Sequence, residues 1–218
     1  IVNGISRIGF MKGGGKALWK DENIADSITS HAIDFIRRNH EEPFFMYLCT
    51  NDIHVPRFPH PRFRGKTDVG HRGDAIVQFD WTIGEVMKTL KELNIDKNTI
   101  IILTSDNGPV VDDGYADRAV ELLGEHRPWG DLRGGKYSNF EAGTRVPLIV
   151  SWPRRVKPGV SGALVSHIDL FASMAALTGT AVDEGAAPDS RDALPALLGR
   201  DAEGRDYVIE KAGSIAVY

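Results

Sequence analysis

The sequence predicts an α/β fold with a largely parallel central sheet flanked by helices. Two continuous apolar runs, residues 44–50 and 99–103, are rich in β-branched and aromatic side chains and are too short for independent helices. Such runs are typical of strands buried on both faces of a parallel sheet. Helical periodicity precedes each run, and an alternation of helices and strands is typical of right-handed crossover connections.

Composition narrows the class of protein. At 218 residues the chain can bury a sizeable core, and it fits one domain, or one domain plus a fragment. The 42% hydrophobic and 26% charged residues are typical of a soluble globular protein. A net charge of -4 without a basic stripe argues against a nucleic-acid partner. We expect no membrane span and find no signal peptide pattern, and the single cysteine excludes an internal disulfide.

The elements follow in order. Residues 13–16, Gly-Gly-Gly-Lys, lack the spacing of a phosphate-binding loop and read as a surface loop. A helix is expected from Asp21, with acidic residues in its first turn and Arg37-Arg38 in its last. Its apolar positions are Ile24, Ile28, Ala32, Phe35 and Ile36. After the strand at 44–50 and a loop at 56–73, a long amphipathic helix carries Ile76, Phe79, Ile83, Val86, Met87, Leu90 and Leu93.

Beyond the strand at 99–103, an insertion-like loop reaches about Arg145. A third apolar strand is expected at 146–152, followed by a helix that starts at Ser166 to Asp169 and stops at Gly179. Residues 180–192 read as a linker, and residues 205–210 could open one more strand.

Polar clusters follow the two central strands. Asp52 and His54 come after the first, and Asp106 and Asn107 come after the second. Ligands gather at the carboxyl ends of parallel strands, so we expect these side chains at one edge of the sheet. Lys136 lies directly after two glycines, where backbone can approach a ligand closely.

These residue types suit an anionic ester. Carboxylate and carboxamide oxygens bind hard cations. An ammonium neutralises the negative charge of the ester oxygens, and an imidazole donates a proton to the leaving group. Each residue also has an ordinary alternative: His54 as a loop histidine, Lys136 as a solvated cation, Asp106 and Asn107 as an Asn-Gly turn.

Four ordered motifs resemble the sulfatases, a branch of the alkaline-phosphatase-like superfamily. They are Asn51-Asp52-Ile53-His54-Val55-Pro56, Thr104-Ser105-Asp106-Asn107-Gly108, Leu132-Arg133-Gly134-Gly135-Lys136 and Phe140-Glu141-Ala142-Gly143-Thr144-Arg145-Val146-Pro147. The resemblance also includes residues 12–26 and 166–179 and implies an alkaline-phosphatase-like fold, incomplete at its amino-terminal side.

The resemblance implies a role for each matching position. Asp106 and Asn107 match the pair that holds a single calcium ion together with two further aspartates. His54 matches the histidine that contacts sulfate and helps to protonate the leaving oxygen. Lys136 matches the lysine that binds sulfate oxygens and neutralises charge on the bridging oxygen. Independently, a carboxamide at position 107 suits calcium better than paired transition metals.

One family feature, the nucleophile, is expected to lie outside this chain. Sulfatases mature a cysteine or serine within Cys/Ser-x-Pro/Ala-x-Arg to formylglycine, but Cys49 is followed by Thr-Asn-Asp-Ile and reads as a packed core residue. Ser190 does not supply the motif either. We therefore expect residues 1–179 to be the later part of a sulfatase catalytic domain, and 180–218 a linker and the start of a small carboxyl-terminal domain. Such a chain alone should be inactive and should bind calcium weakly.

The leading hypothesis is part of an enzyme that hydrolyses sulfate esters of carbohydrates or aryl groups, acting on a sulfated small molecule or glycan. The alternatives are a phosphodiesterase or phosphonate hydrolase of the same superfamily, and a binding module that has lost its nucleophile. By resemblance the full-length protein is periplasmic, extracellular or lysosomal. The loop at 57–72 and Trp129 could touch a sugar, or serve only as solvated surface and packing.

Overall fold

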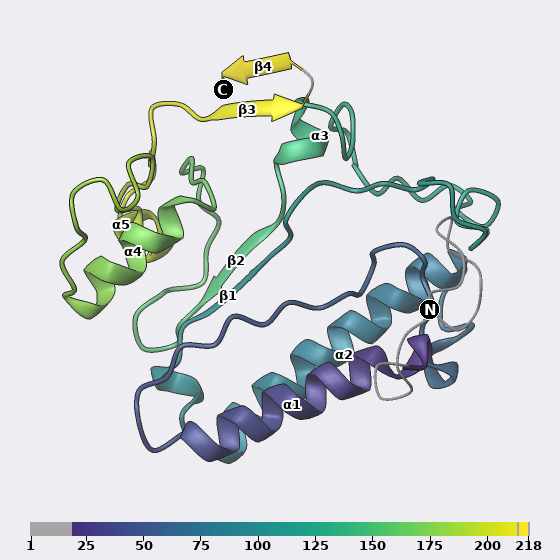
Figure 1. The fold of residues 1–218 in the computed structure, drawn as a ribbon, viewed down its shortest axis with the longest axis horizontal. Coiled ribbons are helices and arrows are strands. Elements are labelled where there is room, and N and C mark those ends of the chain that lie inside the picture. Colours follow the sequence, from purple (N-terminus) through teal and green to yellow (C-terminus); the bar gives the residue numbers. More distant parts are fainter. Residues whose placement is uncertain (1–18, 213, 218) are drawn as a thin grey trace. The chain divides into compact units, whose positions relative to one another are not determined.

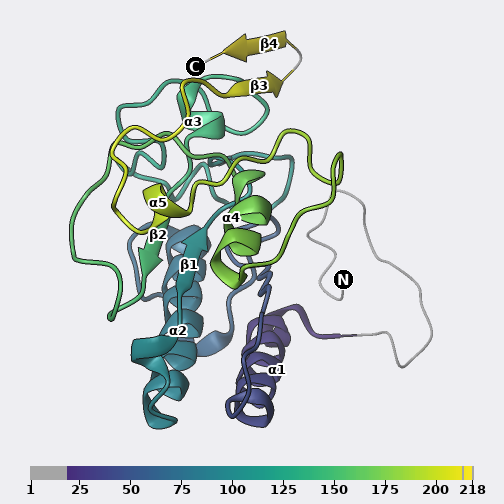
Figure 2. The same ribbon diagram turned by 90° about the vertical axis from the view of Figure 1, so that its left-hand side faces the viewer.

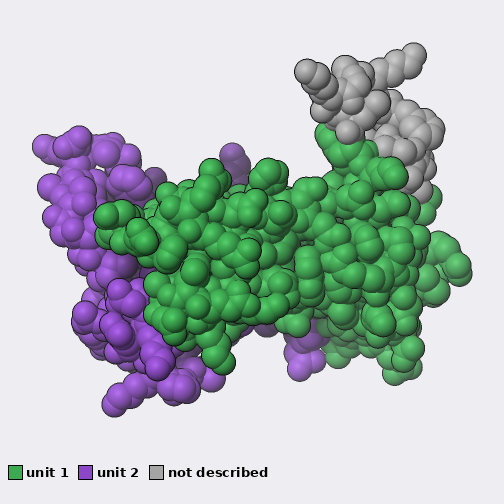
Figure 3. Space-filling model, turned by 90° about the horizontal axis from the view of Figure 1, so that it is seen from below, with its two compact units in different colours: residues 1–96, 110–128 green, residues 97–109, 129–218 purple. Residues whose placement is uncertain are grey.

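The computed structural model describes residues 19–212 and 214–217, which fold as two compact units. Unit 1 comprises residues 1–96 and 110–128, and unit 2 comprises residues 97–109 and 129–218 (Figure 3). The loop at residues 13–16 lies outside the described residues, as does the start of the 12–26 stretch. The main helices and strands are α1 (Ile24–Asn39), α2 (Gly70–Glu92), β1 (Ile101–Thr104), α3 (Glu141–Thr144), β2 (Leu148–Ser151), α4 (Asp169–Thr178), α5 (Leu194–Leu197), β3 (Ile209–Ala212) and β4 (Ser214–Val217).

Unit 1 is built on the pairing of α1 with α2, which lie side by side in Figures 1 and 2. Both helices occur where the periodicity predicts them. Ile36 of α1 is fully buried and Leu90 of α2 is 2% exposed. At the buried contact between the helices, the hydroxyl groups of Thr29 and Thr82 lie 3.1 Å apart and form a hydrogen bond. Among the described residues no helix is both long and apolar enough to cross a membrane.

The buried face of α2 differs from the predicted apolar stripe. Gln78, Thr82 and Thr89 are buried, whereas Met87, which the periodicity assigned to the core, is 49% exposed. Polar side chains can be buried on a helix when hydrogen bonds satisfy them, and the hydroxyl of Thr89 donates to the carbonyl of Glu85. The predicted stripe is buried or half-buried except at Met87, and the packed face also includes polar positions that hydrophobicity alone did not indicate.

Unit 2 contains the strand predicted at residues 99–103. β1 covers four residues of the predicted run and pairs with β2, the predicted third strand. The pairing is antiparallel, with Ile101 opposite Ser151 and Thr104 opposite Leu148. The β3–β4 pair is antiparallel too. In the described chain the only parallel contact is an isolated bridge between Leu164 and Gly204. The parallel pairing of residues 44–50 with residues 99–103, which belong to different units, stays a prediction.

The other predicted central strand, residues 44–50 in unit 1, has no ladder partner in the described chain. Its exposure nevertheless alternates residue by residue: Phe45 and Tyr47 are 74% and 84% exposed, while their neighbours are half-buried. Period-two alternation is the pattern of an extended strand. Cys49 lies on the exposed side, so the expectation that it packs in the core is wrong.

The carboxyl-terminal elements of unit 2 follow the prediction closely. α4 ends at Gly179, whose φ of 69° is the left-handed conformation expected of a helix-terminating glycine. No helix or strand occurs between Gly179 and Ala193, in agreement with a linker-like segment, and β3 begins within the last expected strand. The division of the chain into two domains near residue 179 stays a prediction.

Candidate functional site

The predicted site residues divide between the two units. His54 lies in unit 1, whereas Asp106, Asn107 and Lys136 lie in unit 2. The structure brings the Asp106-Asn107 turn together with the loop that carries Lys136, as described below. The expected meeting of His54 with the unit 2 residues stays a prediction.

Two backbone hydrogen bonds join the Asp106-Asn107 turn to the Lys136 loop. The Gly108 N–H donates to the carbonyl of Gly143 at 2.9 Å, and the Lys136 N–H donates to the carbonyl of Pro109 at 2.9 Å. The loop returns on itself through a further bond, from the Ala142 N–H to the carbonyl of Arg133. These bonds hold the Asp106-Asn107 turn and the lysine within one local structure.

Glycine makes this close approach possible. A Cβ atom on Gly108 would lie 1.7 Å from the carbonyl oxygen of Ala142, a distance that no side chain tolerates. Gly134 has a φ of 93°, which favours glycine strongly, and a Cβ there would lie 2.4 Å from the hydroxyl of Ser138. A Cβ on Gly135 would lie 2.9 Å from the carbonyl oxygen of Pro109, so both glycines before Lys136 allow close packing within the chain. The close approach to a ligand stays a prediction.

The donor atoms of the turn suit a hard cation. Asp106 is exposed and Asn107 is half-buried. The carboxamide nitrogen of Asn107 donates to the carbonyl of Gly108 at 2.8 Å, so the carboxamide oxygen is the atom left for a cation. Calcium takes six to eight oxygen ligands. In the described part of the chain, no group of three or more His, Cys, Asp or Glu side chains is placed to hold a metal ion.

Lys136 is half-buried, and its ammonium lies 5.4 Å from the ring centroid of Tyr137. The aromatic face attracts the cation and restricts where the ammonium can lie. Tyr137 itself has a φ of 76°, and its side chain is 65% exposed. The lysine thus lies beside an exposed aromatic ring at the end of a glycine-rich turn.

In unit 1, the imidazole of His54 is oriented by the next peptide unit. Its Nδ1 lies 2.7 Å from the carbonyl oxygen of Val55. Because a carbonyl only accepts hydrogen bonds, Nδ1 must carry hydrogen, and Nε2 is the atom that gains and loses the proton. This is the arrangement that a histidine needs to deliver a proton from Nε2.

The loop at 57–72, which the sequence offered as solvated surface, begins and ends with buried arginines. The side chain of Arg57 is 1% exposed and pairs with Asp117, 60 positions away, through Nη1 and Oδ2 at 2.9 Å. Arg72 is 5% exposed, and burial together with the charge of Arg57 lowers its pKa to about 10. Both arginines donate to the carbonyl of Val110. No local pattern links positions this far apart.

Asp52 is a second group that the motif alone did not explain. Its Oδ1 accepts a hydrogen bond from the side chain of Gln78 at 2.6 Å, whereas its Oδ2 is buried without a hydrogen-bond partner. Burial raises the pKa of the Asp52 carboxyl, and the bond from Gln78 offsets only part of that shift. This carboxyl therefore holds its proton more tightly than an exposed aspartate does.

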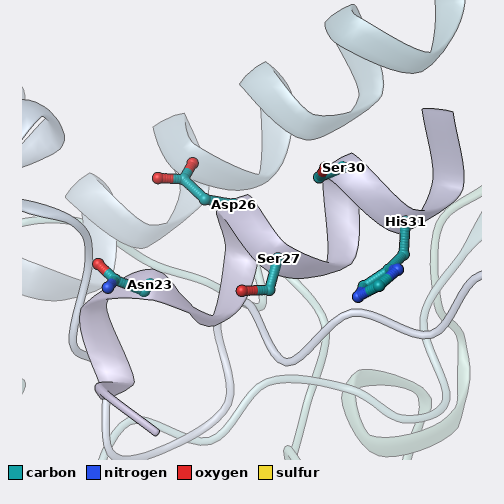
Figure 4. Close-up of a pocket in the computed structure, with 5 residues that line it drawn as sticks. All are labelled: Asn23, Asp26, Ser27, Ser30 and His31. Atoms are coloured by element: carbon teal, nitrogen blue, oxygen red, sulfur yellow. The ribbon is translucent and has the colours of Figure 1, made fainter. Parts of the chain in front are cut away.

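An open hollow of about 430 Å³ lies along α1 and is lined by Asn23, Asp26, Ser27, Ser30 and His31 (Figure 4). None of the four predicted site residues lines it. The carboxylate of Asp26 is engaged by the guanidinium of Arg62, which lowers the pKa of Asp26. The hollow therefore has the character of solvated helix surface.

Comparison with known proteins settles the family. The family model described as Sulfatase matches residues 9–180. The chain belongs to the sulfatase family. It is 59% identical to an N-acetylgalactosamine-6-O-sulfatase of Bacteroides thetaiotaomicron, over 97% of this chain and 41% of that protein. It is 35% identical to the steryl-sulfatase of Homo sapiens, over 82% of this chain and 30% of that protein.

Solved sulfatase structures confirm the alkaline-phosphatase-like α/β fold that the motifs implied. A structure from work on glycosaminoglycan metabolism by Bacteroides thetaiotaomicron superposes with a TM-score of 0.96 at 57% identity, covering all of this chain and 46% of that one. A Pseudoalteromonas sulfatase superposes with a TM-score of 0.76 at 28% identity, covering 88% of this chain and 38% of that one. The chain thus spans less than half the length of these relatives.

Proposed function

We propose that this chain is part of an enzyme that hydrolyses the 6-O-sulfate ester of N-acetylgalactosamine in a sulfated glycan. The observation that carries the proposal is the 59% identity with an N-acetylgalactosamine-6-O-sulfatase over 97% of the chain. A second relative, crystallised with a neocarrahexaose, is 27% identical over 95% of the chain, which supports a carbohydrate as substrate. Asn107 does not favour the phosphodiesterase alternative.

The residues of the chain supply three parts of the reaction. Lys136 binds non-bridging sulfate oxygens and opposes the negative charge that develops as the ester bond breaks. His54, protonated at Nε2, donates that proton to the bridging oxygen when the sulfur–oxygen bond breaks, so the sugar leaves as an alcohol. Asp106 and Asn107 would contribute two oxygen ligands to a calcium ion, which would draw electron density from the sulfate.

The remaining parts come from outside this chain in the proposal. In this proposal the nucleophile belongs to another portion of the full-length protein. Cys49 and Ser190 lack the sequence pattern of a formylglycine precursor, and Ser151, which has it in Ser-Trp-Pro-Arg-Arg, is the last residue of strand β2 and pairs with Ile101. Two protein oxygens are too few for a tight calcium site, so further ligands are needed from there as well. By analogy with the family, we propose a periplasmic, extracellular or lysosomal location for that protein.

The test is to assay the complete protein on N-acetylgalactosamine 6-sulfate and on its 4-sulfated isomer, with calcium or with a chelator. We expect sulfate release from the 6-sulfate at least tenfold faster than from the 4-sulfate, and loss of activity on chelation that calcium restores. Hydrolysis of phosphate diesters in place of sulfate esters would establish the alternative, and binding without turnover would establish a binding module. The 218-residue chain alone should show no turnover.

A further inference from the structure

The residue before His54 has a backbone conformation that its side chain disfavours. Ile53 has a φ of 74°, in the left-handed region. A β-branched residue is rarely found there, and such a conformation is strained. The surrounding structure must therefore hold the chain at Ile53, and this is the peptide that sets the direction of His54.

Arg57 makes the contacts that hold this turn. Its Nε donates to the carbonyl of Ile53 at 3.2 Å, closing the turn from residue 53 to residue 57. The same guanidinium donates to the carbonyls of Val110 and Val111, at 2.6 Å and 3.0 Å, and to the carboxylate of Asp117. A single buried side chain thus ties the carbonyl of the strained residue to a segment more than 50 positions later in the sequence.

Asp117 is itself fixed in place. Its side chain is 3% exposed, and its Oδ1 accepts a hydrogen bond from the N–H of Ala119 at 3.1 Å. Burying two charges costs as much as, or more than, their attraction returns, so an apolar pair of similar size would stabilise the fold at least as well. A stabilising role alone does not account for charged groups at these positions.

A second side chain, that of Gln78, holds the residues on both sides of the turn. Gln78 of α2 donates to Oδ1 of Asp52 at 2.6 Å and accepts from the N–H of His60 at 2.8 Å. Gln78 thus bonds to the residues on either side of the segment 53–57, at Asp52 and at His60, while Arg57 bonds within it. Of these groups, only Arg57 bonds to Ile53 itself in the contacts that the structure describes.

We propose that Arg57, held by Asp117, is a positioning residue for His54. It acts through the carbonyl of Ile53, keeping the backbone of that residue left-handed so that the His54 imidazole is aimed for proton donation from Nε2. This inference rests on the proposed sulfatase function. It concerns orientation only, because the Arg57 guanidinium is buried among protein groups.

The test compares Arg57→Lys with Arg205→Lys in the complete protein. Arg205 is a matched control, since it forms an arginine–aspartate pair in unit 2 with Asp169, whose side chain is fully buried. Lysine keeps the charge but not the forked geometry, so both variants lose fixed hydrogen bonds. Both should melt at lower temperature than the wild type, whereas only Arg57→Lys should lose catalytic rate.

The decisive readout is the dependence on leaving group. A sugar alcohol needs protonation to leave, whereas an aryl oxide such as 4-nitrophenolate does not. For Arg57→Lys we expect kcat on the sugar sulfate to fall at least tenfold, with KM within threefold of the wild type and less than a threefold loss of kcat on 4-nitrophenyl sulfate. Equal losses on both substrates, or the same losses in Arg205→Lys, would overturn the proposal.

A structural readout keeps the two proposals separate. In a crystal structure of the complete Arg57→Lys protein we expect Ile53 to leave the left-handed region and the contact between His54 Nδ1 and the Val55 carbonyl to be lost. An unchanged turn would overturn the positioning role even if the wild type is an active sulfatase. If the wild type releases no sulfate, the proposed function fails, while this readout still decides whether Arg57 orients His54.

Discussion

The two segments that carry the predicted site residues are held in place by different means. The His54 turn, residues 51–57 of unit 1, is held by buried side chains, above all Arg57 and Gln78. The turn at 105–109 and the loop at 133–143 of unit 2 are held by backbone hydrogen bonds at close approach. Side-chain contacts tolerate adjustment, whereas backbone packed against a glycine leaves no space for any other residue. The two segments should therefore respond differently to substitution.

The largest effect is expected in the glycine-packed loops. Replacing Gly108 with alanine places Cβ 1.7 Å from the Ala142 carbonyl oxygen, so the turn must separate from its neighbour. We expect a loss of more than about 3 kcal/mol, beyond the usual cost of overpacking, and poor yield of folded complete protein. Thermal unfolding measures the loss of stability, and soluble expression measures the yield of folded protein.

Gly84→Ala is the control for Gly108→Ala. Gly84 is exposed on α2, and a Cβ there meets nothing within 4 Å. Alanine in a helix interior should raise stability by about 0.5–1 kcal/mol. Similar melting temperatures for the two variants would contradict the role assigned to Gly108.

A smaller effect, dependent on pH, is expected at Asp169 of unit 2. Burial alone would raise the pKa of this carboxyl, but hydrogen bonds from Arg205 and from the N–H groups of Ser166 and Arg191 outweigh burial and lower it. A depressed folded-state pKa contributes stability above the unfolded value of about 3.9, and that stability is lost as pH falls through the folded-state pKa.

Asp169→Asn should therefore destabilise the protein by about 3 kcal/mol at pH 7, the scale of a broken buried ion pair. The difference from the wild type should shrink as pH falls from about 4, the unfolded pKa, through the lower folded-state pKa, where the wild-type carboxyl of the folded protein becomes protonated. Melting temperatures recorded from pH 7 to pH 3 test this, and a difference independent of pH would refute it.

The smallest effect, of opposite sign, is expected at Asp52 in the His54 turn. Burial raises the pKa of its carboxyl, so ionised Asp52 destabilises the folded state above that pKa. Asp52→Asn keeps an oxygen for the bond from Gln78 and removes the charge. We expect a gain of about 0.5–1 kcal/mol at pH 7 that disappears at low pH. A loss of stability at pH 7 would show that the ionised carboxylate has a stabilising partner.

The sequence predicted those parts of the molecule whose signals are local. The glycines at 108, 134 and 135, the termination of α4 at Gly179 and the positions of α1 and α2 all follow from short patterns with one physical cause each. The motifs also identified the family, which the comparisons confirm. Roles for His54, Asp106, Asn107 and Lys136 came from resemblance, and they remain predictions.

Nonlocal contacts were beyond the reach of the sequence. Arg57 and Asp117 lie 60 positions apart, and nothing near either residue indicates the pair. The parallel pairing of the runs 44–50 and 99–103 stays a prediction. Hydrophobicity does not specify strand direction, and the pairing that the structure describes for β1 is antiparallel, with β2. The run at 44–50 has the alternation of a strand without a ladder partner in the described chain.

The most direct test of the account is the activity of the complete protein when His54 or Lys136 is replaced by alanine. Each variant should lose at least about a hundredfold in kcat/KM on N-acetylgalactosamine 6-sulfate, the usual scale of general acid and electrostatic catalysis, while its melting temperature stays within a few degrees of the wild type. Activity within threefold of the wild type in either folded variant would contradict the assignment of that residue to the sulfate site.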